Sequence, residues 1–348
     1  MANNWYATLE AVKRAVNLYG SERDSVISSC IEAASREVDN LTGRRFIPKT
    51  ETRRYRWPQR EQRNAYILYF DQDLLSVSAF TKDGDDATAI PAADYFLEPS
   101  NLGPPYSRIE IDLASTSFFS AKDTHQRALR VTGDWGYGND TKAAGALAEA
   151  DDGSETALDV TDASLIDVGD TILIGTEQMF VSAKAALDTT ANLNGDLTAD
   201  ATVVSVTVTD GTKVKQGETV KLDSELMYVS SISGAVLTVI RAYDGSVLAA
   251  HTGAVDVYAF RTLTVTRSEN GTTAASHATA ATISKYAPPA DIVNLCKALS
   301  IAYYHAGQGG WTGEIGSGEG AVEGRMAALG KLRESVRREY RKIAVGAV

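Results

Sequence analysis

The sequence predicts an α+β protein in which a mainly helical core with a small β section is interrupted by an all-β insert. Three observations predict this fold class. Apolar residues recur at helical spacing near both ends of the chain, the middle of the chain repeats itself, and the excess of acidic charge is confined to that middle. We therefore expect residues 1–139 and 287–348 to form one core and residues 140–286 to form an inserted domain.

The middle of the chain contains two nested repeats. Residues 160–183 match 208–231 after a shift of 48 positions, and residues 237–258 match 263–284 after a shift of 26. The second copy of the first motif runs directly into the first copy of the second. One complete module therefore lies inside another, whose two halves are separated by it.

Short β-prone segments with turn signals between them predict a barrel or a sandwich for the insert. Asp244-Gly245 and Asn270-Gly271 occupy the same place in the two copies and are suited to turns that need positive φ. Two segments rich in Ala, Asp, Thr and Gly, residues 143–157 and 185–200, are expected to be linkers or mobile loops.

The repeats also place a histidine and a glutamate at fixed positions, namely His251 with His277 and Glu177 with Glu225. These residue types could be metal ligands or paired carboxylates. A repeated residue more often solves the same packing or turn problem twice, so we interpret all four as structural. The sequence holds neither a His-Glu-x-x-His nor a Cys-x-x-Cys spacing. We expect no metal, no cofactor and no catalytic residues.

Charge and cysteine content argue against several kinds of binding and against a disulfide framework. Residues 140–286 hold 20 acidic and 9 basic residues, whereas the flanks together are neutral. An acidic insert argues against nonspecific binding to nucleic acid or to membrane surfaces. Cys30 and Cys296 are expected to be buried free thiols rather than a disulfide framework. The start of the chain lacks a signal pattern and no run of 18 apolar residues occurs, so we expect synthesis in a reducing cytoplasm.

The clearest predicted helix covers residues 21–43. Ser21 with Asp24 is typical of a capping box, and Gly43 can supply the left-handed residue after the last turn. A shorter helix precedes it, which invites a helix-turn-helix interpretation. The second helix is acidic and would be repelled by phosphates, so we reject DNA reading.

After Pro48 the pattern changes from helical spacing to alternation. This change predicts the small β section, with strands at 50–57, 66–70, 75–81, 107–113 and 128–132. A Gly-Asp-Trp-Gly-Tyr-Gly sequence at residues 133–138 closes the section and predicts a turn packed by large rings.

The C-terminal flank predicts two helices joined by a glycine-rich segment. Residues 307–320 contain seven glycines, but no Gly-Lys-Ser/Thr follows them, so a phosphate-binding loop is not indicated. The last helix has an apolar stripe that runs from Val322 to Ile343, and its other faces are rich in arginine and lysine. That basic face is either a solvated surface near a helix C-terminus or a contact for an acidic partner, and the sequence leaves both interpretations open.

Joined across the insert, the flanks resemble the head–tail connector (adaptor) proteins of tailed bacteriophages. The resemblance covers roughly residues 5–139 and 287–345. The matching pieces occur in the family's order, and the insert stands where the family runs directly from the Gly-Tyr-Gly turn to a proline-containing helix. They are Ile31 to Val38, Leu41 to Arg44 with Phe46 and Pro48, Val131 to Gly138, Pro289 to Ile292, and the glycine-rich segment before the basic last helix, which ends in Tyr340-Arg341.

The resemblance implies a structural, non-enzymatic protein in the virion neck, made in the host bacterial cytoplasm. Such proteins form a ring, commonly of twelve subunits, beneath the portal and receive a stopper or tail-terminator protein on the other side. Genomic DNA passes through the channel unread, and no membrane is involved. Contacts to the portal or to a neighbouring subunit are expected from Trp311, Arg325, Arg333, Arg337, Arg338, Tyr340, Arg341 and Lys342.

Three other classes remain as alternatives. A decoration or fibre-attachment protein of the virion would be a monomer or a trimer. A carbohydrate-binding β module would expose clustered aromatic side chains in the insert. An enzyme would need a catalytic constellation, which the sequence does not offer.

Overall fold

The computed structural model describes residues 4–59, 64–84, 87–122, 124–308 and 319–342. It is mostly β, with 37% strand and 25% helix, so the prediction of a mainly helical core with a small β section is wrong. The prediction treated the strands between Pro48 and Gly138 as a minor part of a helical core. They form a complete antiparallel sheet with its own apolar core instead of an appendage to the helices.

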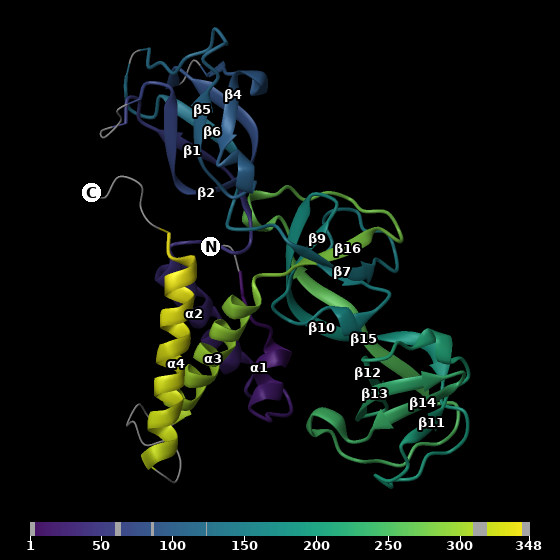
Figure 1. The fold of residues 1–348 in the computed structure, drawn as a ribbon. Helices are drawn as coiled ribbons and strands as arrows, with labels where there is room; N and C mark the ends of the chain where they lie inside the picture. Colours follow the sequence, from purple (N-terminus) through teal and green to yellow (C-terminus); the bar gives the residue numbers. More distant parts are fainter. Residues whose placement is uncertain (1–3, 60–63, 85–86, 123, 309–318, 343–348) are drawn as a thin grey trace.

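The helices form a bundle from both ends of the chain. It consists of α1 (Leu9–Ala15), α2 (Asp24–Thr42), α3 (Ala290–Gln308) and α4 (Glu319–Tyr340), and Figure 1 shows α2, α3 and α4 side by side. The predicted apolar face of α2 is confirmed, because Ile27, Ile31 and Val38 are fully buried in the bundle core. In the described residues, no helix is long and apolar enough to cross a membrane.

Only one of the two predicted ends of α2 is correct. Gly43 ends the helix in the left-handed conformation, with φ of 67°, as its lack of a Cβ allows. The capping box is wrong, because Arg23 occupies the N-cap position and makes no side-chain capping bond.

The first sheet lies at one end of the bundle (Figure 1). Its strands follow the order β1-β6-β2-β5-β4, with β3 beside β2, and all pairs are antiparallel. Aromatic rings fill its core, since Trp135, Phe70 and Tyr55 pack together on one face. The strands are β1 (Lys49–Tyr55), β2 (Ile67–Lys82), β3 (Thr88–Ala89), β4 (Tyr95–Glu98), β5 (Tyr106–Ile111) and β6 (Leu129–Trp135).

The insert lies beside the bundle and contains two apolar cores. The first core, from residues 144–181 and 263–283, defines what we call the outer module. The second core, from residues 193–257, defines the inner module. The strands are β7 (Thr141–Ala146), β8 (Ala157–Asp159), β9 (Thr171–Ile174), β10 (Glu177–Asn192), β11 (Ser205–Thr207), β12 (Thr219–Leu222), β13 (Glu225–Ser233), β14 (Val236–Ile240), β15 (Asp256–Thr266) and β16 (Thr282–Tyr286).

Two long strands, β10 and β15, run through both modules and pair with each other. Register shifts between Val181 and Ala183, Ala185 and Leu187, and Asp188 and Ala191 bend the pair as it passes from one core to the other. The predicted linkers are therefore wrong in part. Residues 185–192 belong to β10 and residues 143–146 to β7. Their small and polar side chains occupy both exposed sheet positions and buried ones, such as Ala144, Thr189 and Ala191.

Several identical apolar residues of the repeats are core residues in both copies. Met179 and Met227 are each fully buried, as are Val181 and Val229. Leu237 and Leu263 match in the same way. The repetition in the sequence therefore records one packing solution used twice.

The insert is held against the rest of the chain by the N-terminal segment. The Trp5 ring packs edge-on against Phe180 at 5.2 Å between centroids. The side-chain amides of Asn4 and Asn270 donate to each other at 2.8 and 2.9 Å. The two connections of the insert also meet, because the Ala287 amide donates to the Asp140 carbonyl at 2.9 Å.

The two equivalent turns of the repeats both contact the host part of the chain. Gly271, with φ of 79°, lies so close to β1 that an added Cβ would stand 2.1 Å from the Thr50 carbonyl oxygen. Gly245, with φ of 78°, lies against the turn between α1 and α2, where the nearest atom to an added Cβ is 3.3 Å away, on Tyr19. The positive φ predicted for both turns is confirmed.

These two glycines give a matched test of the docking contact. Both Gly271→Ala and Gly245→Ala cost about 1 kcal/mol or more from positive φ alone. Only Gly271→Ala adds a clash with a backbone atom, so we expect it to destabilise the protein by about 2 kcal/mol more than Gly245→Ala. Thermal unfolding of the two variants measures the difference. Equal losses would contradict the described contact with β1.

Candidate functional site

Most of the predicted partner-binding residues lie at the end of α4. Val336 and Tyr340 are buried in the bundle core, and Leu329 and Leu332 pack against it. The apolar stripe predicted for the last helix is confirmed for these four residues. The side chains of residues 319–326 and the residues after Lys342 lie outside the described part of the chain.

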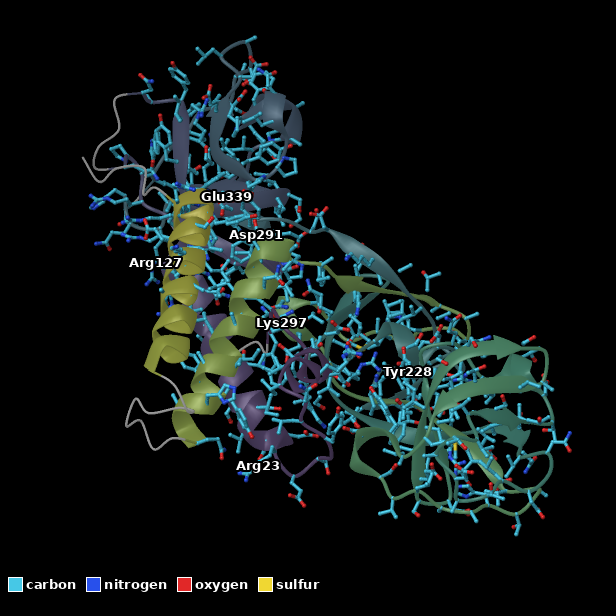
Figure 2. The ribbon with its side chains drawn as sticks, turned by 60° about the horizontal axis from the view of Figure 1, so that its bottom comes forward. Arg23, Arg127, Tyr228, Asp291, Lys297 and Glu339 are labelled. Carbon is cyan, nitrogen blue, oxygen red and sulfur yellow. The ribbon has the colours of Figure 1, made fainter. Side chains whose placement is uncertain are left out.

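Tyr340 closes an aromatic cluster at the junction of the bundle with the first sheet. Its ring lies 5.6 Å from Phe46 and 5.4 Å from Tyr137 between centroids, and Phe46 also packs against Tyr6. Burial, followed by the nearby Glu339 and Asp291 carboxylates, raises the pKa of Tyr340. Figure 2 labels both carboxylate residues where the end of α4 meets the start of α3.

A buried ionic cluster lies beside these rings and ties three parts of the chain together. The Arg44 guanidinium donates to the Tyr340 carbonyl at 2.6 Å and to Asp73 at 2.8 Å, and it lies 5.0 Å from the Tyr137 ring centre. The Lys342 ammonium stands 3.2 Å from the other Asp73 oxygen. Burial lowers the pKa of Lys342, and Asp73 offsets part of that effect. The end of α4 is thereby fixed to β2.

Arg333 also binds within its own chain. Its guanidinium pairs with Glu37 on α2, and the same carboxylate accepts a hydrogen bond from the Tyr303 hydroxyl on α3. One carboxylate therefore joins α2, α3 and α4 on a partly exposed face of the bundle.

The remaining predicted residues divide into two groups. Arg337, Arg338 and Arg341 are exposed, and we call these three the basic end of α4. Arg337 has a loose pairing with Glu334 at 3.5 Å. Trp311 and the side chain of Arg325 lie outside the described residues, as does most of the glycine-rich segment 307–320.

Sequence reasoning missed Asp73. The available signal was that Asp71, Gln72 and Asp73 interrupt an otherwise apolar run from Tyr66 to Leu75. An acidic residue in a buried strand needs a cationic partner, but the sequence does not show that Arg44 and Lys342 would supply it from 29 and 269 positions away.

The repeated glutamates and histidines form a buried cluster in each module. In the inner module, Glu225 accepts two hydrogen bonds from Arg241, at 2.7 and 2.8 Å, and lies 3.0 Å from a His251 ring nitrogen. In the outer module, Glu177 makes the same contacts with Arg267 and His277. The same contacts therefore occur in both modules, as expected for residues that solve one packing problem twice. No group of three or more potential metal ligands gathers anywhere in the described ranges.

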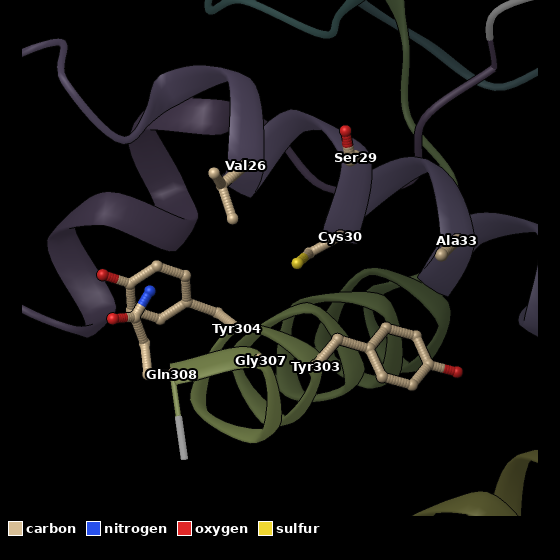
Figure 3. Close-up of a pocket in the computed structure, with 8 residues that line it drawn as sticks. All are labelled: Val26, Ser29, Cys30, Ala33, Tyr303, Tyr304, Gly307 and Gln308. Carbon is tan, nitrogen blue, oxygen red and sulfur yellow. The ribbon is translucent and has the colours of Figure 1, made fainter. Parts of the chain in front are cut away.

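An open groove of about 420 Å³ lies between α2 and the end of α3. Figure 3 shows Val26 and Cys30 pointing from α2 toward the tyrosines of α3. Cys30 and Cys296 are both free, but only Cys296 is buried. The groove is lined by Val26, Ser29, Cys30, Ala33, Tyr303, Tyr304, Gly307 and Gln308.

The aromatic side chains of the insert do not share one environment. Phe180 is 4% exposed and packs against Trp5. Its equivalent in the inner module, Tyr228, is half-buried and packs against Tyr243 at 5.3 Å between ring centroids.

Comparison with known proteins finds no matching family model, no similar curated protein and no similar solved structure.

The ionic cluster predicts that removal of the Asp73 charge strongly destabilises the end of α4. In Asp73→Asn, Arg44 and Lys342 face each other without a counter-charge, which costs about 3 kcal/mol. We expect amide exchange in residues 336–342 to accelerate on the order of 100-fold, measured by hydrogen exchange. Asp71→Asn is the matched control two residues away, because the Asp71 side chain is largely exposed and pairs with Arg53 and the Tyr55 hydroxyl instead of with the end of α4. A similar acceleration in both variants would disprove the anchoring role.

The inner module's cluster predicts a dependence of stability on pH. Burial by itself raises the pKa of Glu225, but hydrogen bonds from Arg241, the Ala242 amide, His251 and the Ala249 amide outweigh it and lower the pKa from 4.5 to about 2. This carboxylate therefore stabilises the fold above pH 4.5, and the contribution is lost as the pH falls through about 2.

We expect Glu225→Gln to unfold at lower urea concentration at neutral pH and to show a smaller loss of stability between pH 4.5 and 2 than the wild type. Urea titrations at several pH values measure both effects. Glu32→Gln, on the exposed face of α2, serves as the control and should behave as the wild type. An unchanged pH dependence in Glu225→Gln would count against the cluster.

Proposed function

We propose that this chain is a structural virion protein of a tailed bacteriophage that forms a ring between the portal and the tail. The ring would provide the channel through which packaged DNA is retained and later ejected. Its partners would be the portal protein, a stopper or tail-terminator protein, and further copies of the chain, twelve in a complete ring. The site of action is then the neck of the virion.

One observation carries this proposal, namely the convergence of separate sequence pieces on one junction. The pieces that resemble connector proteins are scattered along the chain, and Arg44 and Tyr340 are 296 positions apart. Phe46, Tyr137 and Tyr340 nevertheless pack on one another, and Arg44 contacts the last two. A chance resemblance of short motifs gives no reason for those motifs to meet in space.

The basic end of α4 is the surface that we assign to the portal or to the neighbouring subunit. Tyr340 and Lys342 are used within the chain, and they hold the helix so that Arg337, Arg338 and Arg341 face outward. Trp311 and Arg325 remain part of the proposed surface on sequence grounds. In a ring, such a surface meets a different surface of the next subunit, which is a heterologous contact.

The distribution of charge suits a conduit. The insert holds 20 acidic and 9 basic residues, so phosphates are repelled from it and DNA is not held there. We place the insert away from the channel, at the periphery of the ring.

The experiment mixes the purified chain with the portal protein of the same phage and determines the mass and symmetry of the product. We expect a complex of cyclic symmetry. The triple variant Arg337→Glu, Arg338→Glu, Arg341→Glu should weaken assembly at least 10-fold, because each reversed charge replaces an attraction by a repulsion.

The matched control reverses three exposed lysines of the insert, Lys142→Glu, Lys213→Glu and Lys215→Glu, and should leave assembly unchanged. Absence of the chain from the head–tail junction of intact virions would refute the proposed function. Equal effects of the two triple variants would refute the assigned surface alone.

A further inference from the structure

Val168 of the outer module is buried in the core of the helical bundle, and Tyr286 on β16 packs against the same core while partly exposed. Val168 belongs to the insert by sequence, yet it is 9% exposed and packs in the apolar core of the helices. Its carbonyl accepts a hydrogen bond from the Leu9 amide at 2.9 Å. The next residue, Gly169, lies so close to Trp5 that an added Cβ would stand 2.5 Å from the ring. The loop around Val168 is therefore a close-fitting joint between insert and bundle.

A carboxylate from α1 completes this joint. The Val168 amide donates to both oxygens of Glu10, at 3.0 and 3.2 Å. Lys184 on β10 stands 3.8 Å from Glu10 and 3.9 Å from Asp167. The ammonium group is already engaged with the carbonyls of Ile166 and Ala163, at 2.5 and 3.1 Å.

The remaining charged groups at the joint do not neutralise Glu10. Arg14, on the same helix, pairs with Asp167 at 3.5 Å, and the Thr8 hydroxyl donates to the same carboxylate. Asp170 in the loop is paired with Lys285 on β16 at 2.8 Å. Glu10 and Asp167 thus share the distant Lys184 ammonium at a partly buried place, and Arg14 pairs with Asp167 alone, so ionisation of Glu10 adds a poorly compensated negative charge.

The inner module shows that this joint is not a general property of the repeat. The position equivalent to Val168 is Gln216, which is exposed, and Gly217 lies against Ser164 of the outer module instead of against an aromatic ring. Only the outer copy carries the apolar residue that the bundle core accepts.

We propose that Glu10 is a protonation-controlled latch that sets how tightly the β insert is attached to the helical bundle. With a proton on Glu10, the carboxyl group still accepts from Val168 and adds no charge beside Asp167. Without the proton, the attachment is weaker. This inference does not depend on the proposed role in the virion.

The pKa of Glu10 agrees with the surroundings described for its carboxyl group. Burial, and then the charge of Asp167, raise the pKa of Glu10 from 4.5 to about 7, against the opposing effect of Lys184. A carboxyl group with a raised pKa favours the attached state below its ordinary pKa, and the attachment weakens as the pH rises from about 4.5 to about 7. The change therefore falls in the range around neutrality.

Hydrogen exchange of the complete chain tests the latch. The Leu9 and Val168 amides report on the joint, and amides of β2 in the first sheet serve as an internal reference. After correction for intrinsic exchange, we expect protection at the joint to fall on the order of 100-fold between pH 5 and pH 8 in the wild type. Protection in β2 should not follow that change.

Three variants separate the latch from a general pH effect. Glu10→Gln keeps an acceptor for Val168 without a titrating group, so its protection should stay high and flat across this range. Asp167→Asn removes the neighbouring charge and should move the midpoint to lower pH. Glu22→Gln, an exposed carboxylate before α2, should match the wild type. Equal protection at pH 5 and pH 8 in the wild type, or a wild-type pH profile in Glu10→Gln, would overturn the proposal.

Discussion

The arrangement of bundle and insert depends on the segment from Asn4 to Leu9, which lies between them and bonds to both. On the bundle side, the Tyr6 hydroxyl donates to Asp39, and the Asn4 carbonyl accepts from Arg36. On the insert side, Trp5 packs against Phe180, and the Leu9 amide donates to Val168. Because this segment bonds to both parts, and Asn4 itself contacts both, a change here affects two parts of the molecule at once.

The first sheet is held by a different kind of contact. Aromatic packing around Phe46 joins it to the bundle, while Arg44, Asp73 and Lys342 fix the geometry of that packing through charge. Apolar rings supply most of the favourable burial, and the paired charges make the arrangement specific, since any displacement leaves a buried charge uncompensated. The junction is thus rigid at the point where the exposed arginines of α4 begin.

Much of the local structure could be predicted from the sequence. The spacing of Ile27, Ile31 and Val38 indicated α2, and Gly43 indicated its end. Alternation after Pro48 indicated β1, β5 and β6, divided the long β2 into two strands, and did not indicate β3 or β4. Periodicity reports which face of an element is buried, but it does not report how many elements share a sheet, and the importance of the β section was underestimated for that reason.

Other features depend on contacts that no local pattern encodes. The Ala-rich stretch after Val181 has the composition of a linker, yet it is a strand because β15 pairs with it. Within the candidate site, the apolar stripe of α4 was predictable from spacing alone. The ionic cluster was not, because Asp73 meets partners that lie far away in the sequence and whose charge alone does not single them out.

The nested order of the chain also determines when each part can fold during synthesis. The inner module is complete before the last strands of the outer module are made, and both precede α3. The apolar face of α2 therefore waits for a partner that follows about 250 residues later. At ordinary rates of translation this interval lasts about 10 to 50 s. During that time only the short α1 and the N-terminal segment can cover Ile27, Ile31 and Val38. A nascent chain therefore exposes the apolar face of α2 while the β modules are already folded.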